Sequence, residues 1–212
     1  MKNILLADDH AIIRGGLRVL INSYLSHSTV DEASDGDSAF EKVKENDYHL
    51  IVLDVNMPGT DTFGLVHNII SIRPHSNILM FSMNAEKIYA RKFLQLGAKG
   101  YLSKGSSEDE IRTAIDQVLE GKRYLSPSLI TLLTEEALGN SDGNPFNNLS
   151  SREIEIVSHL IKGESSTEIC RILNLQPSTV GTFKSRIFEK LKCKNLIEVM
   201  DLAKVHTLAA KI

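Results

Sequence analysis

Five side chains in the N-terminal half of this 212-residue chain follow the ends of short apolar runs: Asp8, Asp9, Asp54, Ser82 and Lys104. Three carboxylates at one place repel one another and favour a hard divalent cation such as Mg²⁺, which prefers oxygen ligands. A carboxylate beside that cation can attack phosphorus, and a lysine ammonium and a serine hydroxyl can hold the phosphoryl oxygens. The set predicts phosphoryl transfer to an aspartate, a reaction that depends mainly on positioning and charge neutralisation.

These residues converge only if the apolar runs form one parallel sheet. The runs are rich in Ile, Leu and Val and apolar on both faces, as buried parallel strands are: Ile4–Ala7, Leu50–Leu53, Ile78–Phe81 and the weaker Gly100–Leu102. Amphipathic stretches lie between them, and Gly97 and Gly121 stand where helices end. This alternation predicts an α/β fold with a doubly wound, five-stranded parallel sheet and a ligand site at the carboxyl ends of its strands.

Composition is consistent with a cytoplasmic protein. No apolar run reaches the roughly 18 residues that a membrane span needs. The acidic Asp8 and Asp9 come too early for a signal peptide, and the two cysteines, Cys170 and Cys193, are expected to be reduced. The net charge is −3, but residues 149–212 carry ten Lys and Arg against seven Asp and Glu. This asymmetry places any contact with a phosphate backbone in the C-terminal part.

The alternation of strands and helices stops after residue 121. Residues 1–121 are predicted to form the first domain, and residues 122–148 a linker with a short helix from Ser126-Pro127 to about Leu138. The segment Gly139–Pro145 has turn and linker composition. Residues 149–212 are predicted to form an all-α domain of four helices, in which Ser150 and Glu153 make a capping box.

Two of these helices, joined by the short turn 174–176, predict a helix-turn-helix. The second begins at Pro177, with Val180, Phe183, Ile187 and Leu191 expected in the core. Small hydrogen-bonding residues and cations occupy its other side, and residues 179–194 hold five Lys or Arg against one Glu. Such a helix suits the major groove of DNA, although its charge alone equally fits a solvated scaffold helix.

The N-terminal motifs resemble a bacterial response-regulator receiver domain: Asp8-Asp9, Asp54-Val55-Asn56-Met57-Pro58-Gly59, Ser82 and Tyr101-Leu102-Ser103-Lys104. The resemblance implies a flavodoxin-like fold, phosphorylation of Asp54 by a sensor histidine kinase, and a switch pair of Ser82 and Tyr101. It also implies a Mg²⁺ site at Asp8, Asp9, Asp54 and the backbone carbonyl of Asn56. Met83 departs from the pattern, because the family usually has a small residue there, and is expected to affect the phosphorylation rate.

The C-terminal motifs resemble a LuxR-type DNA-binding domain: Leu149-Ser150-Ser151-Arg152-Glu153, Gly163, Glu168-Ile169, Leu173, Thr179-Val180 and Lys190-Leu191. With the receiver, the whole chain is similar to a NarL/FixJ-family regulator of transcription. The expected contacts with double-stranded DNA are Ser178, Thr179, Gly181, Thr182, Lys184, Ser185, Arg186 and Lys190. Gly181 replaces a common Lys and Phe183 a common His, so the helix is expected to make few direct contacts with bases.

A homodimer, formed or exposed on phosphorylation, is expected to bind two half-sites. The last helix carries an apolar stripe at Leu196, Val199, Met200 and Ala203. This stripe predicts either a dimer contact or packing on the first helix of the same domain.

Two other functions compete with the switch. An aspartate-dependent phosphatase would use the same carboxylates, but Asn56 stands where a haloacid-dehalogenase-type enzyme needs a second Asp. A binding module with a vestigial receiver would not need the intact acidic set. The chain is therefore expected to be a regulator rather than a metabolic enzyme.

Overall fold

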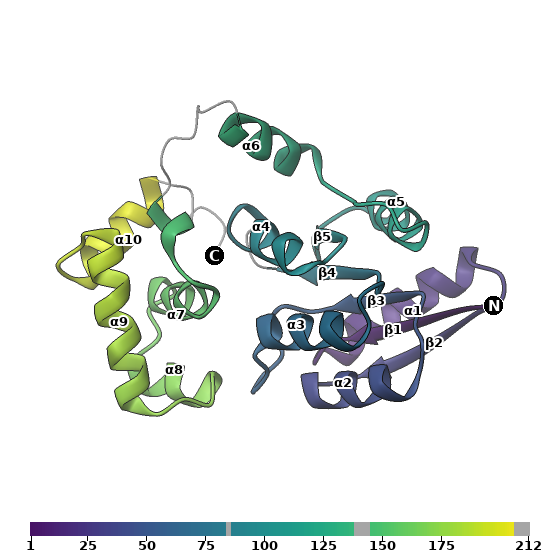
Figure 1. The fold of residues 1–212 in the computed structure, drawn as a ribbon, viewed down its shortest axis with the longest axis horizontal. Coiled ribbons are helices and arrows are strands. Elements are labelled where there is room, and N and C mark those ends of the chain that lie inside the picture. Colours follow the sequence, from purple (N-terminus) through teal and green to yellow (C-terminus); the bar gives the residue numbers. More distant parts are fainter. Residues whose placement is uncertain (84–85, 138–144, 206–212) are drawn as a thin grey trace. The chain divides into compact units, whose positions relative to one another are not determined.

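The computed structural model describes residues 1–83, 86–137 and 145–205 (Figure 1). The chain divides into two compact units, Met1–Thr131 and Leu132–Ile212. The predicted linker, residues 122–148, spans this division. Its turn-forming part falls mainly on residues 138–144, which lie outside the described residues.

Five parallel strands form a single sheet in the order β2-β1-β3-β4-β5. They are β1 (Lys2–Ala7), β2 (Ser28–Ala33), β3 (Leu50–Leu53), β4 (Ile78–Ser82) and β5 (Gly100–Ser103). Strand order reverses between β1 and β3, and a ligand site is expected outside the carboxyl ends at such a reversal. The predicted doubly wound α/β fold is confirmed.

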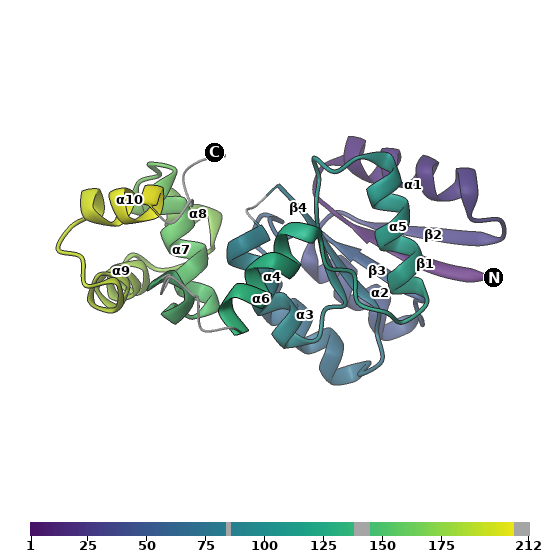
Figure 2. The same cartoon turned by 90° about the horizontal axis from the view of Figure 1, so that it is seen from above.

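Helices cover both faces of the sheet (Figures 1 and 2). One face carries α1 (Ala11–Tyr24) and α5 (Glu108–Leu119), and the other carries α2 (Gly36–Glu45), α3 (Thr62–Ile72) and α4 (Glu86–Leu96). The inner strands are buried on both faces because each layer supplies apolar side chains, Ile21 and Ile115 from one side and Val66 and Phe93 from the other. A packed, rigid sheet therefore presents the loops at its carboxyl edge.

Helix ends follow the sequence signals. Gly97 and Gly121 both have positive φ, at 112° and 76°, as predicted for glycines that end helices. The linker helix α6 runs from Pro127 to Ala137, close to the predicted range. No helix of the described segments is long and apolar enough to cross a membrane.

The second unit is helical, as predicted: η1 (Pro145–Asn148), α7 (Ser151–Ile161), α8 (Ser166–Ile172), α9 (Pro177–Leu191) and α10 (Leu196–Val205). The capping box of Ser150 and Glu153 is present, and Asn195 caps α10 by accepting a hydrogen bond from the Glu198 N–H at 3.0 Å. Helix α7 packs against α9 and α10 through fully buried apolar side chains. Four residues join α8 to α9, and this is the helix-turn-helix geometry.

Candidate functional site

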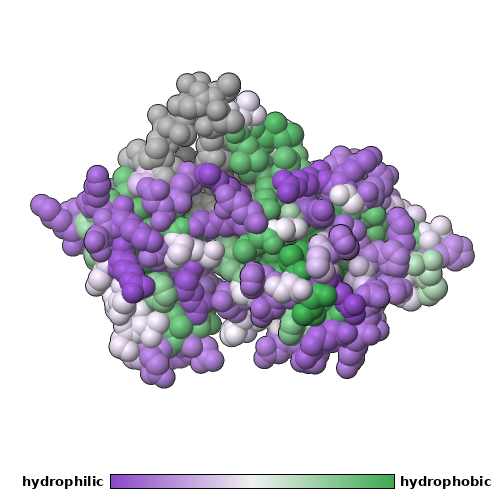
Figure 3. Space-filling model, in the orientation of Figure 1, coloured by the Kyte–Doolittle hydropathy of each residue, from purple (hydrophilic) through white to green (hydrophobic). Residues whose placement is uncertain are grey.

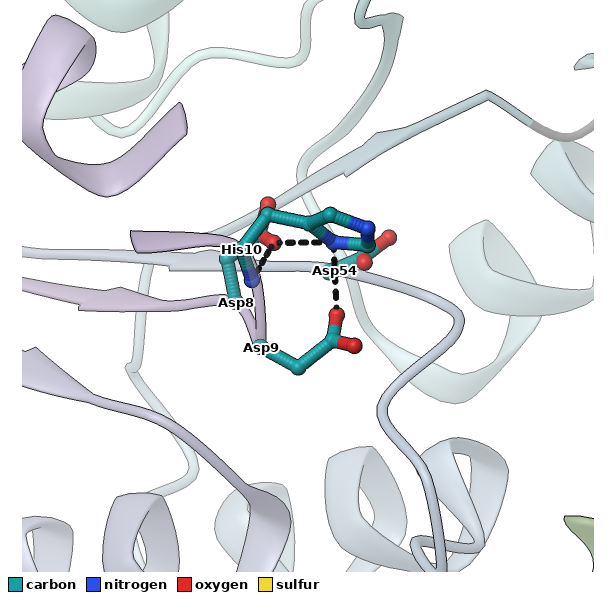
Figure 4. Close-up of side chains that lie close together, drawn as sticks. All are labelled: Asp8, Asp9, His10 and Asp54. Atoms are coloured by element: carbon teal, nitrogen blue, oxygen red, sulfur yellow. Dashed lines mark hydrogen bonds and ion pairs between the residues drawn. The ribbon is translucent and has the colours of Figure 1, made fainter. Parts of the chain in front are cut away.

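The carboxyl edge of the sheet gathers the predicted acidic residues. Asp8 and Asp9 follow β1, Asp54 follows β3, and Lys104 follows β5. Asp8 and Asp54 are buried, with 3% and 2% of their surfaces exposed. Ligand atoms of Asp8, Asp9, Asp54 and the neighbouring His10 all lie within 4.8 Å of one another (Figure 4).

Lys104 holds two of these carboxylates from the buried side. Its ammonium lies 2.6 Å from Asp8 Oδ2 and 2.8 Å from Asp54 Oδ2. Burial alone would lower the pKa of Lys104, but the hydrogen bonds to Asp54 and Asp8 outweigh it and leave that pKa raised. Lys104 therefore stays charged and neutralises part of the acidic cluster.

The second oxygen of Asp54 has a different environment. Asp54 Oδ1 is buried and accepts no hydrogen bond of regular geometry from the described residues, although the Asn56 backbone N–H acts on this carboxyl. Burial raises the pKa of the Asp54 carboxyl, Lys104 opposes that effect, and the nearby Asp8 adds to it. A buried oxygen without a hydrogen-bond donor is costly, and a cation beside it or a covalent bond to it would relieve that cost. The donor set consists of carboxylate oxygens, three of which (Asp8 Oδ2, Asp9 Oδ1 and Asp54 Oδ1) are buried without a regular hydrogen bond, and it fits a hard divalent cation.

His10 belongs to this cluster, although the sequence analysis did not single it out. Its Nδ1 lies 2.8 Å from Asp9 Oδ1 and 3.2 Å from Asp8 Oδ1, so the ring stands between the two carboxylates (Figure 4). The sequence signal that could have identified it is its position, because His10 directly follows Asp8 and Asp9 and histidine can bind a metal. Periodicity did not reveal it, because His10 precedes α1 and takes no part in the helical stripe.

Arg14 fixes the loop that carries Asp8. Its guanidinium donates to the Asp8 backbone carbonyl at 2.5 Å and to Glu32 Oε2 at 3.0 Å. The loop after β1 is thereby tied to β2, which keeps the Asp8 carboxylate over the end of β3.

Ser82 and Tyr101, the expected switch pair, are both completely buried. The Tyr101 ring lies inward, with its centroid 6.4 Å from that of Phe93, and Phe93 stacks on Phe63 at 4.3 Å. Burial raises the pKa of the Tyr101 phenol well above its usual value, and the neighbouring Ser82 hydroxyl acts in the opposite sense. The expected switch pair is therefore arranged with the ring inward.

Two other predicted residues lie in loops at this edge. Asn56 is exposed two residues after Asp54. Met83 is 72% exposed, so most of its side chain is in contact with solvent. Its effect on phosphorylation stays a prediction.

The predicted DNA-contacting face of α9 is largely exposed. Its exposed predicted residues are Ser178, Gly181, Thr182, Ser185, Arg186 and Lys190, while Thr179 and Lys184 are half-buried. Val180, Ile187 and Leu191 are buried as predicted, and Phe183 is half-buried. The surface over α9 is mostly hydrophilic or neutral in Figure 3. The hydroxyls of Thr182 and Ser185 donate to the Ser178 and Gly181 carbonyls four residues earlier, at 2.9 and 3.2 Å.

Lys190 differs from the other predicted contacts, because its ammonium lies 2.7 Å from Glu153 Oε2 at the start of α7. This ion pair joins two helices and was not predicted from the sequence, although the capping box predicted Glu153 at the helix terminus. On α10, Val199 and Ala203 are fully buried in a helix that packs on α7, whereas Leu196 and Met200 are half-buried. The burial of Val199 and Ala203 therefore fits the second of the two predicted alternatives, in which the stripe packs on the first helix of the same domain.

Comparisons with known proteins identify a family for each of the two parts of the chain. Residues 4–116 match the family described as the response regulator receiver domain. Residues 147–203 match the family described as bacterial regulatory proteins, luxR family. The first match covers the acidic cluster, and the second covers the helix-turn-helix.

The chain matches similar proteins over nearly their whole length. The chain is 32% identical to the response regulator UvrY of Escherichia coli, over 98% of this chain and 96% of that protein. It is also 32% identical to the oxygen regulatory protein NreC of Staphylococcus carnosus, over 94% and 95% of the two chains. The structure of RcsB from Salmonella enterica, bound to a promoter with a phosphomimetic, shares the fold, with a TM-score of 0.69 and 24% identity over 96% and 99% of the chains. The chain belongs to the response regulators that join a receiver domain to a LuxR-type DNA-binding domain, and it is a transcription regulator rather than a metabolic enzyme.

Proposed function

We propose that Asp54 accepts a phosphoryl group from a sensor histidine kinase and that this event controls binding of residues 149–212 to specific DNA. The observation that carries the proposal is the Asp54 carboxylate itself. Lys104 holds Oδ2 at 2.8 Å, while Oδ1 is buried without a hydrogen bond of regular geometry. One oxygen is thus fixed and the other is available as a nucleophile.

Mg²⁺ would be held by Asp9, Asp54 and the Asn56 carbonyl, with Asp8 acting directly or through water. When bound, the ion neutralises charge on the phosphoryl oxygens. Lys104 would turn from Asp54 to a phosphoryl oxygen, and the Ser82 hydroxyl would donate to another. Asp8 and Asp54 are themselves 3% and 2% exposed, so little water reaches these two residues before a ligand binds.

The alternative of an aspartate-dependent phosphatase is less well supported. Asn56 cannot supply the general acid that a second Asp would provide two residues after the nucleophile. A vestigial receiver is also disfavoured, because Lys104 still bridges Asp8 and Asp54.

Mass spectrometry after incubation with acetyl phosphate and Mg²⁺ tests the phosphorylation. One phosphoryl group should be gained by the wild-type chain and by Asp47→Asn, but not by Asp54→Asn. Asp47 is the matched control, since its side chain is 85% exposed and lies outside the acidic cluster, where it pairs with Arg73 at 3.3 Å. Phosphate on Ser82 or a histidine would contradict the assignment, and turnover of phosphate esters would favour the phosphatase.

The exposed face of α9 is proposed to enter the major groove. Thr182 and Ser185 would read base edges by releasing their intrahelical bonds, and Lys184 and Arg186 would contact phosphates. Each phosphate contact should add about one unit to the slope of log affinity against log salt. Salt-independent binding, or no DNA binding at low salt, would contradict this part.

Signal transfer is proposed to depend on Lys104 and on a dimer that binds two half-sites. Lys104→Met should leave cation binding largely intact and weaken the increase in DNA affinity on phosphorylation. We expect the protein to act in the cytoplasm, where kinase and DNA meet. Sedimentation and DNA footprints, each with and without phosphorylation, test the dimer. A monomer in both states that protects one half-site would contradict it.

A further inference from the structure

We propose that the Glu86 carboxylate couples the linker helix α6 to the state of Asp54, and that phosphorylation loosens the first turn of α6 by withdrawing this carboxylate. The inference rests on the proposed phosphorylation of Asp54 and identifies the contact through which it reaches the linker. That contact lies within the first unit, Met1–Thr131.

The start of α6 is built around one hydroxyl group. Ser126, the residue before α6, is 7% exposed, and its Oγ accepts the Leu129 N–H at 3.1 Å. The same hydroxyl donates to Glu86 Oε2 at 2.7 Å. Ser128 donates to that oxygen as well, at 2.8 Å. One carboxylate oxygen of α4 therefore holds two residues at the beginning of the linker helix.

The other oxygen of Glu86 makes this contact easy to release. Glu86 Oε1 is buried and accepts no hydrogen bond from the described residues. A buried oxygen without a donor is costly, and a movement that returns the carboxylate to water removes that cost. The cost offsets part of what the two serine hydroxyls contribute, so a modest bias is enough to change the population of the bound arrangement.

Glu86 also follows closely after the expected switch residue Ser82. Ser82 is the last residue of β4, and Glu86 begins α4 four residues later. The buried Ser82 hydroxyl is proposed to donate to the phosphoryl group on Asp54, which would draw the end of β4 toward that residue. The start of α4 is expected to follow, because the chain between the two residues is short. Glu86 would then move away from Ser126 and Ser128.

The buried Tyr101 phenol provides a second connection between Asp54 and Glu86. Burial is the main cause that raises the pKa of this phenol, and the Asp54 and Glu86 carboxylates raise it further. Tyr101 thus lies within the electrostatic reach of both carboxylates. A change at either one alters the surroundings of the same side chain.

Hydrogen exchange of the full chain, followed by NMR with and without acetyl phosphate and Mg²⁺, tests the coupling. Phosphorylation should speed exchange of the Leu129 amide by about 2-fold to 30-fold, the range expected for the loss of a helix cap. In Glu86→Ala this amide should exchange rapidly in both states, so phosphorylation should no longer change its rate. Glu86→Gln keeps an oxygen that can accept the serine hydroxyls and should retain part of the response.

Tyr124→Phe is the matched control. The Tyr124 hydroxyl donates to Glu110 Oε1 on α5 at 2.8 Å, which is another hydrogen bond between the linker and the first domain. Glu110 lies on α5 rather than at the start of α4, so the loss of this bond should leave the response of the Leu129 amide to phosphorylation as it is in the wild type.

The outcomes separate this inference from the phosphorylation on which it rests. If the wild-type chain gains one phosphoryl group by mass and the Leu129 exchange rate stays constant, or rises equally in Glu86→Ala, the coupling through Glu86 is overturned. An equal loss of the response in Tyr124→Phe would overturn it too, because general loosening of the linker would then be the cause. A wild-type chain that gains no phosphoryl group overturns the proposed function, and this inference with it.

Discussion

The Lys190 ammonium lies 2.7 Å from Glu153 Oε2, and the Glu153 residue is 2% exposed. The same oxygen accepts the Ser150 backbone N–H at 2.6 Å, so one carboxylate caps α7 and holds α9. Burial alone would raise the pKa of Glu153, but Lys190 and Ser150 outweigh it, and that pKa lies below its usual value. The cation on α9 that was expected to contact DNA phosphate thus has a structural partner.

Lys190→Met should therefore destabilise the second unit. The buried carboxylate would lose its cation, at a cost of about 1 to 3 kcal/mol, toward the lower end because the Lys190 side chain is 41% exposed. Lys184→Met should leave the free energy of unfolding nearly unchanged and lower the salt slope of DNA binding by about one unit. Urea unfolding and DNA titrations at several salt concentrations measure the two effects.

A double-mutant cycle with Glu153→Gln separates the ion pair from other effects of the substitutions. A coupling free energy near zero between Glu153 and Lys190 would show that the pair contributes nothing. A full unit of salt slope lost in Lys190→Met, with stability intact, would return Lys190 to the DNA interface.

Contacts between side chains of different helices, such as the ion pair between Lys190 and Glu153, were not predicted from the sequence. Buried strands were predicted because they are short continuous apolar runs, and amphipathic helices because their apolar periodicity repeats over several turns. The strand β2 was not located, since it is an edge strand in which Thr29 and Asp31 are exposed. The helix α3 was not located either, because buried residues occupy so much of its surface that no clear polar stripe remains.

Site residues divide in the same way. Asp8, Asp54 and Lys104 were predicted because they follow strands, and parallel topology alone brings strand ends together. The position of the His10 ring in the acidic cluster depends on the direction of one side chain, which spacing does not determine. Likewise, an apolar stripe predicts which residues of α10 are buried. It does not determine whether α7 or a second chain covers Val199 and Ala203.

Acid should destabilise the second unit in two steps. Burial lowers the pKa of His159 below 6.5, although Glu164 at 2.6 Å opposes the shift. The pKa of Glu153 lies below 4.5. For both groups the pKa is lower in the folded protein than in the unfolded chain, so the unfolded chain binds the proton at a higher pH. The stability is therefore complete above the pKa of the unfolded chain, and it falls as the pH drops from that pKa toward the pKa of the folded protein. The first loss should begin near pH 6.5 and the second near pH 4.5.

Urea unfolding from pH 8 to pH 4, followed by a probe in the second unit, measures this dependence. His159→Gln should remove the loss between pH 6.5 and pH 5 and leave the loss at lower pH. Stability that rises as pH falls from 7 to 5 would contradict the predicted sign for His159.

The linker helix α6 should depend on a hydrogen bond from the first unit. Ser126 is the residue before α6, and its hydroxyl accepts the Leu129 N–H at 3.1 Å and donates to Glu86 Oε2 at 2.7 Å. Ser126→Ala removes the cap and the link to α4, so α6 should lose about 0.5 to 2 kcal/mol. Hydrogen exchange of the α6 amides measures this local loss.

Ser128→Ala is the matched control, because Ser128 also donates to Glu86 Oε2, at 2.8 Å, but is exposed. It should have a smaller effect on α6 exchange than Ser126→Ala. Equal protection of α6 in both variants and the wild type would show that neither hydrogen bond stabilises the helix.

Gly181 should be a position where stability and DNA affinity can both be raised. It lies on the exposed face of α9, and an added Cβ would meet no atom within 4 Å. Gly181→Ala should stabilise the second unit by about 1 kcal/mol, because glycine is a poor helix former. Gly181→Lys should keep part of that gain and add about one unit to the salt slope of DNA binding. Weaker DNA binding by both variants would instead indicate that the DNA backbone approaches α9 closely at this position.

Ile197 should contribute to the proposed dimer in place of the buried members of the predicted stripe. It is 71% exposed on α10, whereas Val199 and Ala203 are completely buried. A single recognition helix reads few base pairs, so two-fold pairing of copies is expected to add a second half-site. Ile197→Asp places a charge on that surface and should weaken binding to a two-half-site DNA much more than binding to a single half-site.

The free energy of unfolding distinguishes this effect from damage to the domain. Ile197→Asp should change it by no more than about 0.5 kcal/mol, as exposed substitutions usually do. Val199→Asp buries a charge against α7 and should unfold the second unit, which abolishes binding to both DNAs. Sedimentation of the phosphorylated protein gives the oligomeric state directly. If Ile197→Asp dimerises and binds paired half-sites as the wild type does, the contact lies elsewhere, because the exposed part of α10 would then be dispensable for pairing.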